Sequence, residues 1–274
     1  MTEIIKAIIF GIVEGITEWL PVSSTGHMIL LDEFVTLDQS AAFKEMFLVV
    51  IQLGAIMAVV LTYFPRLWPF SASRENHFIK KDVWSMWFKV LVACIPAVIV
   101  EFTIGDYAEA MFYNYTVVAI MLILVGVFFI IAEYANKYHK PKMNSIAEIT
   151  YKTAFIIGMF QLVAAIFPGT SRSGATILGA LLIGVSRTAA AEFTFFLAIP
   201  VMFGASLIKL IKFGADFSGN ELVVLGVGML TAFVVSMIVI RLLMGYIKKH
   251  DFTAFGWYRI LLGTVVLVYF GLWV

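Results

Sequence analysis

The chain is poor in charged residues and in cysteine. Of its 274 residues 14% are charged and one is a cysteine, Cys94, so no disulfide can form within the chain. Soluble domains are typically about 25% charged and about 45–50% apolar, whereas this chain is 62% hydrophobic. This composition excludes an ordinary soluble domain and predicts an all-α integral membrane protein.

Motifs of familiar soluble enzymes are absent as well. The sequence has no GxxxxGK[ST] phosphate loop and no Cys/His spacing typical of zinc sites. The net charge of +1 argues neither for nor against a charged partner, and we expect no nucleic acid to bind. The N-terminus lacks the charged region and cleavage site of a signal peptide, so we expect it to stay in the mature protein.

Long apolar runs are what the sequence does contain. A spanning helix needs about 20 mostly apolar residues, and the segments that meet this length are 45–64, 84–104, 114–134, 189–211, 221–244 and 254–273. Two further segments, 3–36 and 150–186, each combine two short helical runs around a break of Pro, Ser, Thr and Gly. Broken helices survive at membrane depth only when protein or a wet cavity surrounds them. The pattern predicts six transmembrane helices plus two re-entrant helix-loop-helix segments.

The two halves of the chain repeat with a constant offset. An offset of 147 residues pairs Gly11 with Gly158, Pro21 with Pro168, Ser24 with Ser171, and Glu45 with Glu192. One broken segment and three spans cross the membrane an odd number of times, so the second half is inverted relative to the first. We therefore expect a single membrane domain over 1–274, with inverted repeats 1–136 and 148–274 joined by a basic cytoplasmic loop.

Loop charge predicts the orientation. Basic residues gather in three loops, at Arg66, Arg74, Lys80, Lys81, Lys137, Lys140, Lys142, Lys152, Lys248 and Lys249. The positive-inside rule places these loops in the cytoplasm. The first broken segment then enters from outside, so we expect its polar residues to be open to the outer face.

The first break, EGITEWLPVSSTGH at 14–27, is unusually polar for this chain. Glu14 and Glu18 fall one turn apart on one helix face, and two such carboxylates repel unless they share a proton or a cation. We expect them to hold a divalent metal, Mg²⁺ or Ca²⁺, which prefers oxygen ligands. The alternative is a pair of packing residues, one of them neutral. His27 is a candidate for proton transfer or nucleophilic attack, although a lone buried histidine is more often structural.

Three hydroxyl residues follow Pro21, where we expect the helix to break. Ser23, Ser24 and Thr25 precede a second short helix. Hydroxyls and free amide N–H groups at a helix start form a site for an anion, whereas ordinary N-capping by a serine is the alternative.

The second break, PGTSRSGAT at 168–176, supplies a cation. Arg172 offers a rigid fork of donors that fits phosphate oxygens. The phosphate-binding residues that we predict in this turn are Ser171, Arg172, Ser173, Gly174 and Thr176. The alternative is a salt bridge from Arg172 to Glu14 or Glu18, which also brings the two breaks together. Such a site suits an anion with a long apolar tail, above all a lipid phosphate or diphosphate.

Both motifs resemble those of a known family, the bacterial undecaprenyl-pyrophosphate phosphatases (undecaprenyl-diphosphatases), which confer bacitracin resistance when abundant. The similarity also covers IQLGAI at 51–56, GVSR at 184–187 and AEFTFFLAIP at 191–200. The resemblance implies a multi-pass enzyme of the bacterial plasma membrane that removes one phosphate from undecaprenyl diphosphate and so recycles the carrier lipid for peptidoglycan. It also implies a divalent metal, a homodimer, and six spans plus two re-entrant helix pairs among the membrane lipids.

The family's functional positions match this sequence at Glu14, Glu18, Ser23, Ser24, His27, Ser171, Arg172, Ser173 and Thr176. Our hypothesis is metal-assisted hydrolysis, in which Glu14 and Glu18 hold the ion and Arg172 neutralises charge on the phosphoryl oxygens. The nucleophile is open between water, His27 and Ser24. A transporter or flippase of a polyprenyl phosphate lipid is the rival function, because broken helices in inverted repeats are common in transporters.

Overall fold

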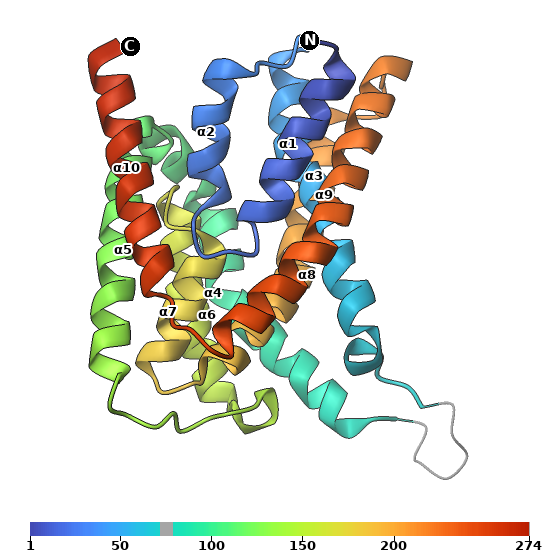
Figure 1. The fold of residues 1–274 in the computed structure, drawn as a ribbon. Coiled ribbons are helices and arrows are strands. Elements are labelled where there is room, and N and C mark those ends of the chain that lie inside the picture. The colour runs from blue at the N-terminus through green and yellow to red at the C-terminus, as the bar shows by residue number, and fades with distance from the viewer. Residues whose placement is uncertain (72–78, 274) are drawn as a thin grey trace.

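The computed structural model describes residues 1–71 and 79–273, and these residues form ten α-helices and one short 3₁₀ helix (Figure 1). The helices are α1 (Glu3–Thr17), α2 (Ser24–Phe34), α3 (Ala41–Leu67), α4 (Lys81–Phe112), α5 (Tyr115–Asn136), η1 (Ile146–Glu148), α6 (Tyr151–Ile166), α7 (Arg172–Leu182), α8 (Arg187–Phe213), α9 (Gly219–Ile247) and α10 (Thr253–Trp273). Arg74, one of the predicted basic loop residues, lies outside the described residues.

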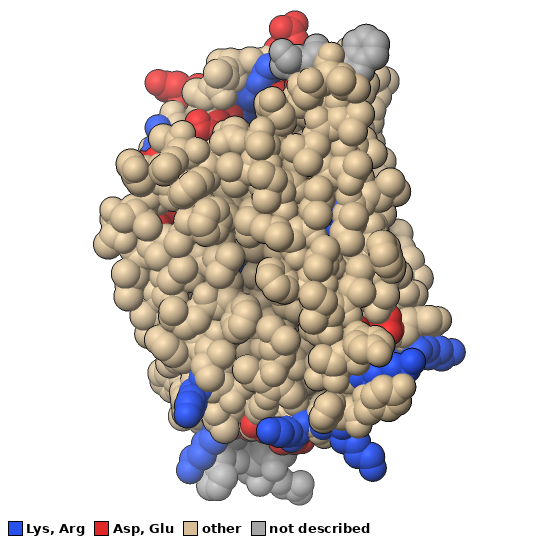
Figure 2. Space-filling model, turned by 90° about the vertical axis from the view of Figure 1, so that its left-hand side faces the viewer, with Lys and Arg blue, Asp and Glu red and all other residues tan. Residues whose placement is uncertain are grey.

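Six of these helices are long and apolar enough to cross a membrane: α3, α4, α5, α8, α9 and α10. They confirm the six predicted spans, and α4 extends furthest beyond its predicted bounds. At most 50% of the most apolar stretch of each helix is buried inside the protein, which leaves the rest for lipid. Figure 2 shows a broad uncharged belt, with Lys and Arg gathered mainly at one end and Asp and Glu mainly at the other. The chain is thus an all-α, multi-pass membrane protein.

The remaining long elements form two helix pairs that turn inside the bundle. In Figure 1, α1 and α2 run from the end that carries both chain termini, whereas α6 and α7 come from the opposite end. Both pairs turn near mid-height, so their turns meet within the bundle. This shape is consistent with re-entrant segments, and their entry into and exit from one side of the membrane stays a prediction.

Helix neighbours correspond between the two halves. α1 packs mainly on α9, and α6 packs mainly on α4. Glycines at the predicted repeat positions allow both approaches, because a Cβ on Gly11 would lie 2.6 Å from the oxygen of Gly228, and one on Gly158 would lie 2.4 Å from that of Ala93. Small residues of this kind let membrane helices pack closely.

Two ion pairs also correspond, one at each end of the contact between α3 and α8. Glu45 near the start of α3 pairs with Lys209 near the end of α8. Glu192 near the start of α8 pairs with Arg66 near the end of α3, at 2.7 Å. These contacts support an inverted repeat, which itself stays a prediction.

Candidate active site

Each helix pair turns through a serine with a left-handed backbone. Ser23 and Ser171 have φ of 73° and 69°, and they are the only non-glycine residues with positive φ in the described part of the chain. Each caps the helix that follows: Ser23 Oγ accepts from the N–H of Gly26 at 3.3 Å, and Ser171 Oγ accepts from the N–H of Gly174 at 3.1 Å. Such strained backbones cluster at functional sites. The two turns are therefore built alike.

These caps correct the predicted register of the repeat. Ser23 and Ser171 are 148 residues apart (171 − 23), whereas the sequence paired Ser24 with Ser171 at 147. The second turn has one additional residue between its proline and its cap, and it includes Gly169 with φ of 88°. The predicted equivalence of Ser24 and Ser171 is wrong, because the inserted residue shifts the helix start: the structural counterpart of Ser24 is Arg172.

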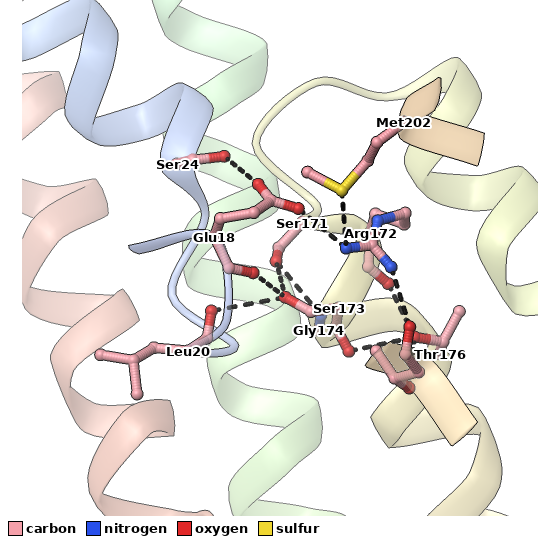
Figure 3. Close-up of polar contacts among 10 residues, drawn as sticks. Glu18, Leu20, Ser24, Ser171, Arg172, Ser173, Gly174, Thr176 and Met202 are labelled. Atoms are coloured by element: carbon pink, nitrogen blue, oxygen red, sulfur yellow. Dashed lines mark hydrogen bonds and ion pairs between the residues drawn. The ribbon is translucent and has the colours of Figure 1, made fainter. Parts of the chain in front are cut away.

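Glu18 joins the two turns (Figure 3). Its Oε2 accepts a hydrogen bond from Ser24 Oγ at 2.9 Å, and its Oε1 forms a salt bridge with Arg172 Nη2 at 2.8 Å. Ser24 and Arg172 are the first residues of α2 and α7. The side chains of Glu18 and Arg172 are 9% and 13% exposed, so this ion pair is largely removed from water. The salt bridge that the sequence left as an alternative is present.

Ser173 and Thr176 hold α7 in place. Ser173 Oγ donates to the carbonyl oxygen of Glu18 at 3.1 Å, which adds a second link between the turns. The hydroxyl of Thr176 is fully buried and contacts the oxygen of Arg172 and the hydroxyl of Thr194. In this structure Thr176 packs α7 against α8, and its contact with phosphate stays a prediction.

Glu14 is buried with an unpartnered oxygen. Its Oε1 has no hydrogen-bond partner, and the same holds for both amide atoms of its buried repeat counterpart Gln161. An unpaired buried polar group costs about 1–3 kcal/mol, so Glu14 calls for a proton, a water or a cation. The described residues contain no group of three or more His, Cys, Asp or Glu that could hold a metal. Mg²⁺, however, is commonly held by one or two carboxylates together with waters and substrate phosphates, and Glu14 with Glu18 fits that donor set.

His27 is engaged through both ring nitrogens. Nδ1 lies 2.7 Å from the carbonyl oxygen of Ser23, and Nε2 lies 2.7 Å from the hydroxyl of Tyr258, whose ring stacks on the imidazole. A carbonyl oxygen only accepts, so Nδ1 carries a proton; in a neutral ring Nε2 then accepts from Tyr258. Thr25 lies half-buried nearby in the first turn of α2.

Comparison with known proteins gives a match over most of the chain. The family described as bacitracin resistance protein BacA matches residues 7–265. The chain belongs to this family. Relatives named undecaprenyl-diphosphatase are 63% identical in Desulfitobacterium hafniense, over 98% of this chain and 97% of the relative, and 60% identical in Enterococcus faecalis, over 97% and 96%. A relative from Clostridium acetobutylicum, named undecaprenyl-diphosphatase 1, is 64% identical over 98% and 97%. The family resemblance that the two motifs carry is confirmed.

In this member of the BacA family, a second buried arginine, which is not among the predicted site residues, links the two turns. The guanidinium of Arg259 on α10 is fully buried and donates to the carbonyl oxygens of Pro21 (3.1 Å), Gly169 (2.8 Å), Thr170 (2.9 Å) and Leu122 (3.4 Å). Gly174 packs closely beside it, because a Cβ there would lie 3.2 Å from Arg259 Nη1, a contact that would require a small shift of the guanidinium. The available signal was the lone arginine within the apolar run 254–273, since intramembrane charges are functional candidates by default.

Proposed function

We propose that the chain is a membrane phosphatase that hydrolyses undecaprenyl diphosphate to undecaprenyl phosphate and phosphate, which recycles the carrier lipid for peptidoglycan and other wall polymers. The observation that carries this is the meeting of Ser24 and Arg172 on one carboxylate, Glu18. A hydroxyl, a base and a phosphate-binding cation are the parts that phosphoryl transfer needs. The names of the relatives support the substrate, and the family's name supports bacitracin resistance.

Ser24 is the nucleophile in this scheme. Its Oγ attacks the terminal phosphorus, its proton passes to Glu18, the bond to the bridging oxygen breaks, and undecaprenyl phosphate leaves. Water then attacks the phosphoserine, and Glu18 returns the proton to Ser24 as phosphate departs. Arg172 leaves its salt bridge to neutralise charge on the phosphoryl oxygens. His27 is less suited to attack, because both of its nitrogens are occupied within the protein.

A divalent ion, Mg²⁺ or Ca²⁺, completes the charge balance of the site. The carboxylates of Glu14 and Glu18 offset the guanidinium groups of Arg172 and Arg259, so the site is formally neutral before a diphosphate adds further negative charge. Glu14, with its unpartnered oxygen, and Glu18 would hold the ion. When bound, the ion supplies Lewis-acid stabilisation of the phosphoryl oxygens.

Trapping of a phosphorylated enzyme tests the nucleophile. Purified protein is mixed with undecaprenyl diphosphate labelled in its terminal phosphate, quenched within one turnover and digested. We expect the label on Ser24 in the wild-type protein, and no label in Ser24→Ala. Label on His27, or turnover by Ser24→Ala at the wild-type rate, overturns this assignment.

Phosphate release in detergent tests the activity itself and separates it from transport. Purified full-length protein should release phosphate from undecaprenyl diphosphate, lose this activity with a chelator and regain it with Mg²⁺ or Ca²⁺. Transport cannot be scored without a membrane, so release can only report hydrolysis. A folded protein that releases no phosphate but moves a prenyl phosphate across vesicles would be a flippase instead.

The site is open to the outer face in this proposal, because the basic loops lie in the cytoplasm. Cysteine labelling tests this, since the one native cysteine is buried and can be replaced in a Cys94→Ala background. An impermeant maleimide should label Glu33→Cys in intact cells, and Lys140→Cys only after the membrane is permeabilised. The opposite pattern reverses the orientation. A homodimer is also expected, and light scattering of the purified protein checks it.

A further inference from the structure

A cavity of about 600 Å³ lies at the end of the bundle opposite the chain termini. It is bounded by the C-terminal ends of α5, α7 and α9 and by the N-terminal end of α8. α7 separates it from the candidate active site, because Arg172 begins this helix and Leu182, which ends it, lines the cavity. At 1.5 Å per residue, the 11 residues of α7 span roughly 16 Å. The cavity is therefore a separate site.

Lysines line this cavity, and the part of the chain that the structure describes gives them no acidic partner. Four of the lining residues are lysines, namely Lys137, Lys140, Lys142 and Lys248. None of the four forms an ion pair with any residue that the structure describes. Figure 2 shows basic side chains gathered at this end of the molecule.

The carboxylate in the lining does not offset these charges. Glu133 is bound by Arg187, whose Nε lies 2.9 Å from Oε1 and whose Nη2 lies 2.5 Å from Oε2. The backbone N–H of Phe252 also donates to Oε1, at 3.0 Å. The side chain of Glu133 is 1% exposed. Because Glu133 and Arg187 neutralise each other, the four lysines leave the cavity with a net positive charge.

The loop that carries three of these lysines is held against the body of the protein. The N–H groups of Lys142 and Met143 donate to the oxygen of Gly184, at 2.8 and 3.1 Å, and the N–H of Ser186 donates back to Met143. Asn136 Nδ2 donates to the oxygen of Leu181 at 3.2 Å. The cavity is thus built before any ligand arrives, which lowers the entropic cost of binding.

Apolar residues form another part of the cavity wall, namely Leu181, Leu182, Ile183, Val185 and Ile247. Leu182 is 53% exposed, so this wall continues to the surface of the protein. Basic pockets between membrane helices bind the headgroups of anionic lipids. We propose that this cavity binds a phosphate group through its lysines, carried either by the headgroup of an anionic lipid or by free inorganic phosphate.

Removal of two lining lysines, one from the segment after α5 and one from the end of α9, tests the proposal. The pocket variant is Lys142→Gln with Lys248→Gln. The matched control is Lys152→Gln with Lys249→Gln, which removes the same charge from exposed residues that do not line the cavity. Native mass spectrometry of the full-length protein measures binding of phosphatidylglycerol and of phosphatidylcholine with the same chains, and calorimetry measures binding of inorganic phosphate.

We expect saturable binding of phosphatidylglycerol that is about tenfold or more weaker in the pocket variant and unchanged in the control, since each basic residue at a membrane surface contributes substantially to anionic lipid binding. Phosphatidylcholine should bind more weakly. Inorganic phosphate that binds in place of the lipid, with the same dependence on Lys142 and Lys248, supports the phosphate site and identifies a soluble ligand. Equal binding of both lipids without phosphate binding, equal losses in the two variants, or no binding at all overturns the proposal.

Discussion

The two turns at the centre of the bundle share a backbone and differ in their side chains. Each is capped by a serine with left-handed φ and is followed by a helix of 11 residues. The helix begins with Ser24 in the first turn and with Arg172 in the second, and both side chains reach Glu18. The similar backbones thus place the first residue of each helix against the same carboxylate. Because that residue is a serine in one turn and an arginine in the other, Glu18 contacts a hydroxyl and a cation.

The carboxylates themselves come from the first half alone. At the predicted repeat offset of 147 residues, Glu14 corresponds to Gln161 and Glu18 to Ala165. In the proposed function the first helix pair therefore provides the acid, base and metal-ligand groups, and the second pair provides phosphate recognition. Arg259 belongs to neither turn, but it binds the backbone of both and keeps them in register.

Removal of Arg259 should have the largest effect, because its guanidinium binds the backbone of both turns. Arg259→Ala leaves buried carbonyl oxygens of both turns without donors, and such losses cost on the order of 3 kcal/mol or more of folding free energy. We expect a strongly lowered thermal unfolding temperature in detergent and little activity. The control is Arg241→Ala, which removes an exposed arginine of α9 and should leave both properties unchanged. A wild-type unfolding temperature for Arg259→Ala would contradict the role assigned to this residue.

Removal of Arg172 should abolish the cationic contact that the second turn provides to the phosphoryl group. Arg172→Ala removes the main electrostatic contact to the phosphoryl group, so turnover should fall by about 10²-fold or more. Phosphate release by folded, membrane-inserted protein measures this. Arg66→Ala breaks another arginine–glutamate pair between the halves, outside the site, and should retain near wild-type turnover. If Arg172→Ala retains more than roughly a tenth of the wild-type rate, Arg172 is not the main group that neutralises charge on the phosphoryl oxygens.

The sequence predicted those parts of the fold that depend on composition. Six spans follow from apolar runs long enough to cross a membrane, and the two breaks follow from Pro21 and Pro168 with their hydroxyl neighbours. The sequence also predicted that the polar residues of the two breaks lie together, because polar groups are costly at membrane depth, and the contacts of Glu18 with Arg172 and Ser173 confirm this placement. The functional roles of these residues stay predictions. A salt bridge from Arg172 to Glu14 or Glu18 was the alternative to phosphate binding in the sequence, and the structure contains the pair with Glu18.

The pairing of residues across the turns depends on backbone detail that composition does not carry. One inserted residue between Pro168 and Ser171 shifts the register, and only the left-handed caps show that Ser24 corresponds to Arg172. Arg259 binds carbonyl oxygens, which every residue has, so nothing in the sequence of its partners indicates the contact. Tyr258 reaches the side chain of His27 across 231 residues, and this contact depends on how α10 packs beside α2.

Replacement of the Glu14 carboxylate by an amide, the group that Gln161 carries in the second half, tests whether the metal is bound by the first half of the chain. Glu14→Gln removes one of the two expected metal ligands, so the Mg²⁺ concentration for half-maximal activity should rise about tenfold or more. The measurement is a metal titration of phosphate release after chelation. An unchanged half-maximal concentration would exclude Glu14 as a ligand.

Gln161 is the matched control for Glu14. Gln161→Leu removes a buried amide that has no hydrogen-bond partner in the protein, and such a change is close to neutral for stability or slightly stabilising. We expect an unfolding temperature at or above the wild-type value and no change in the metal titration. A large loss of activity would show that the second helix pair also carries chemistry at this position.

The smallest effects are expected at the two serine caps, where the turns are most alike. Ser23→Gly and Ser171→Gly each relieve a left-handed backbone, worth about 1 kcal/mol, and lose a cap, which costs only a few tenths of a kcal/mol when glycine replaces serine. Ser→Ala at the same positions keeps the strain and loses about 1 kcal/mol of capping. Thermal unfolding should therefore rank glycine at or above serine, and serine above alanine, in both turns. A different order in one turn would mean that the two backbones are not held by the same balance of strain and capping.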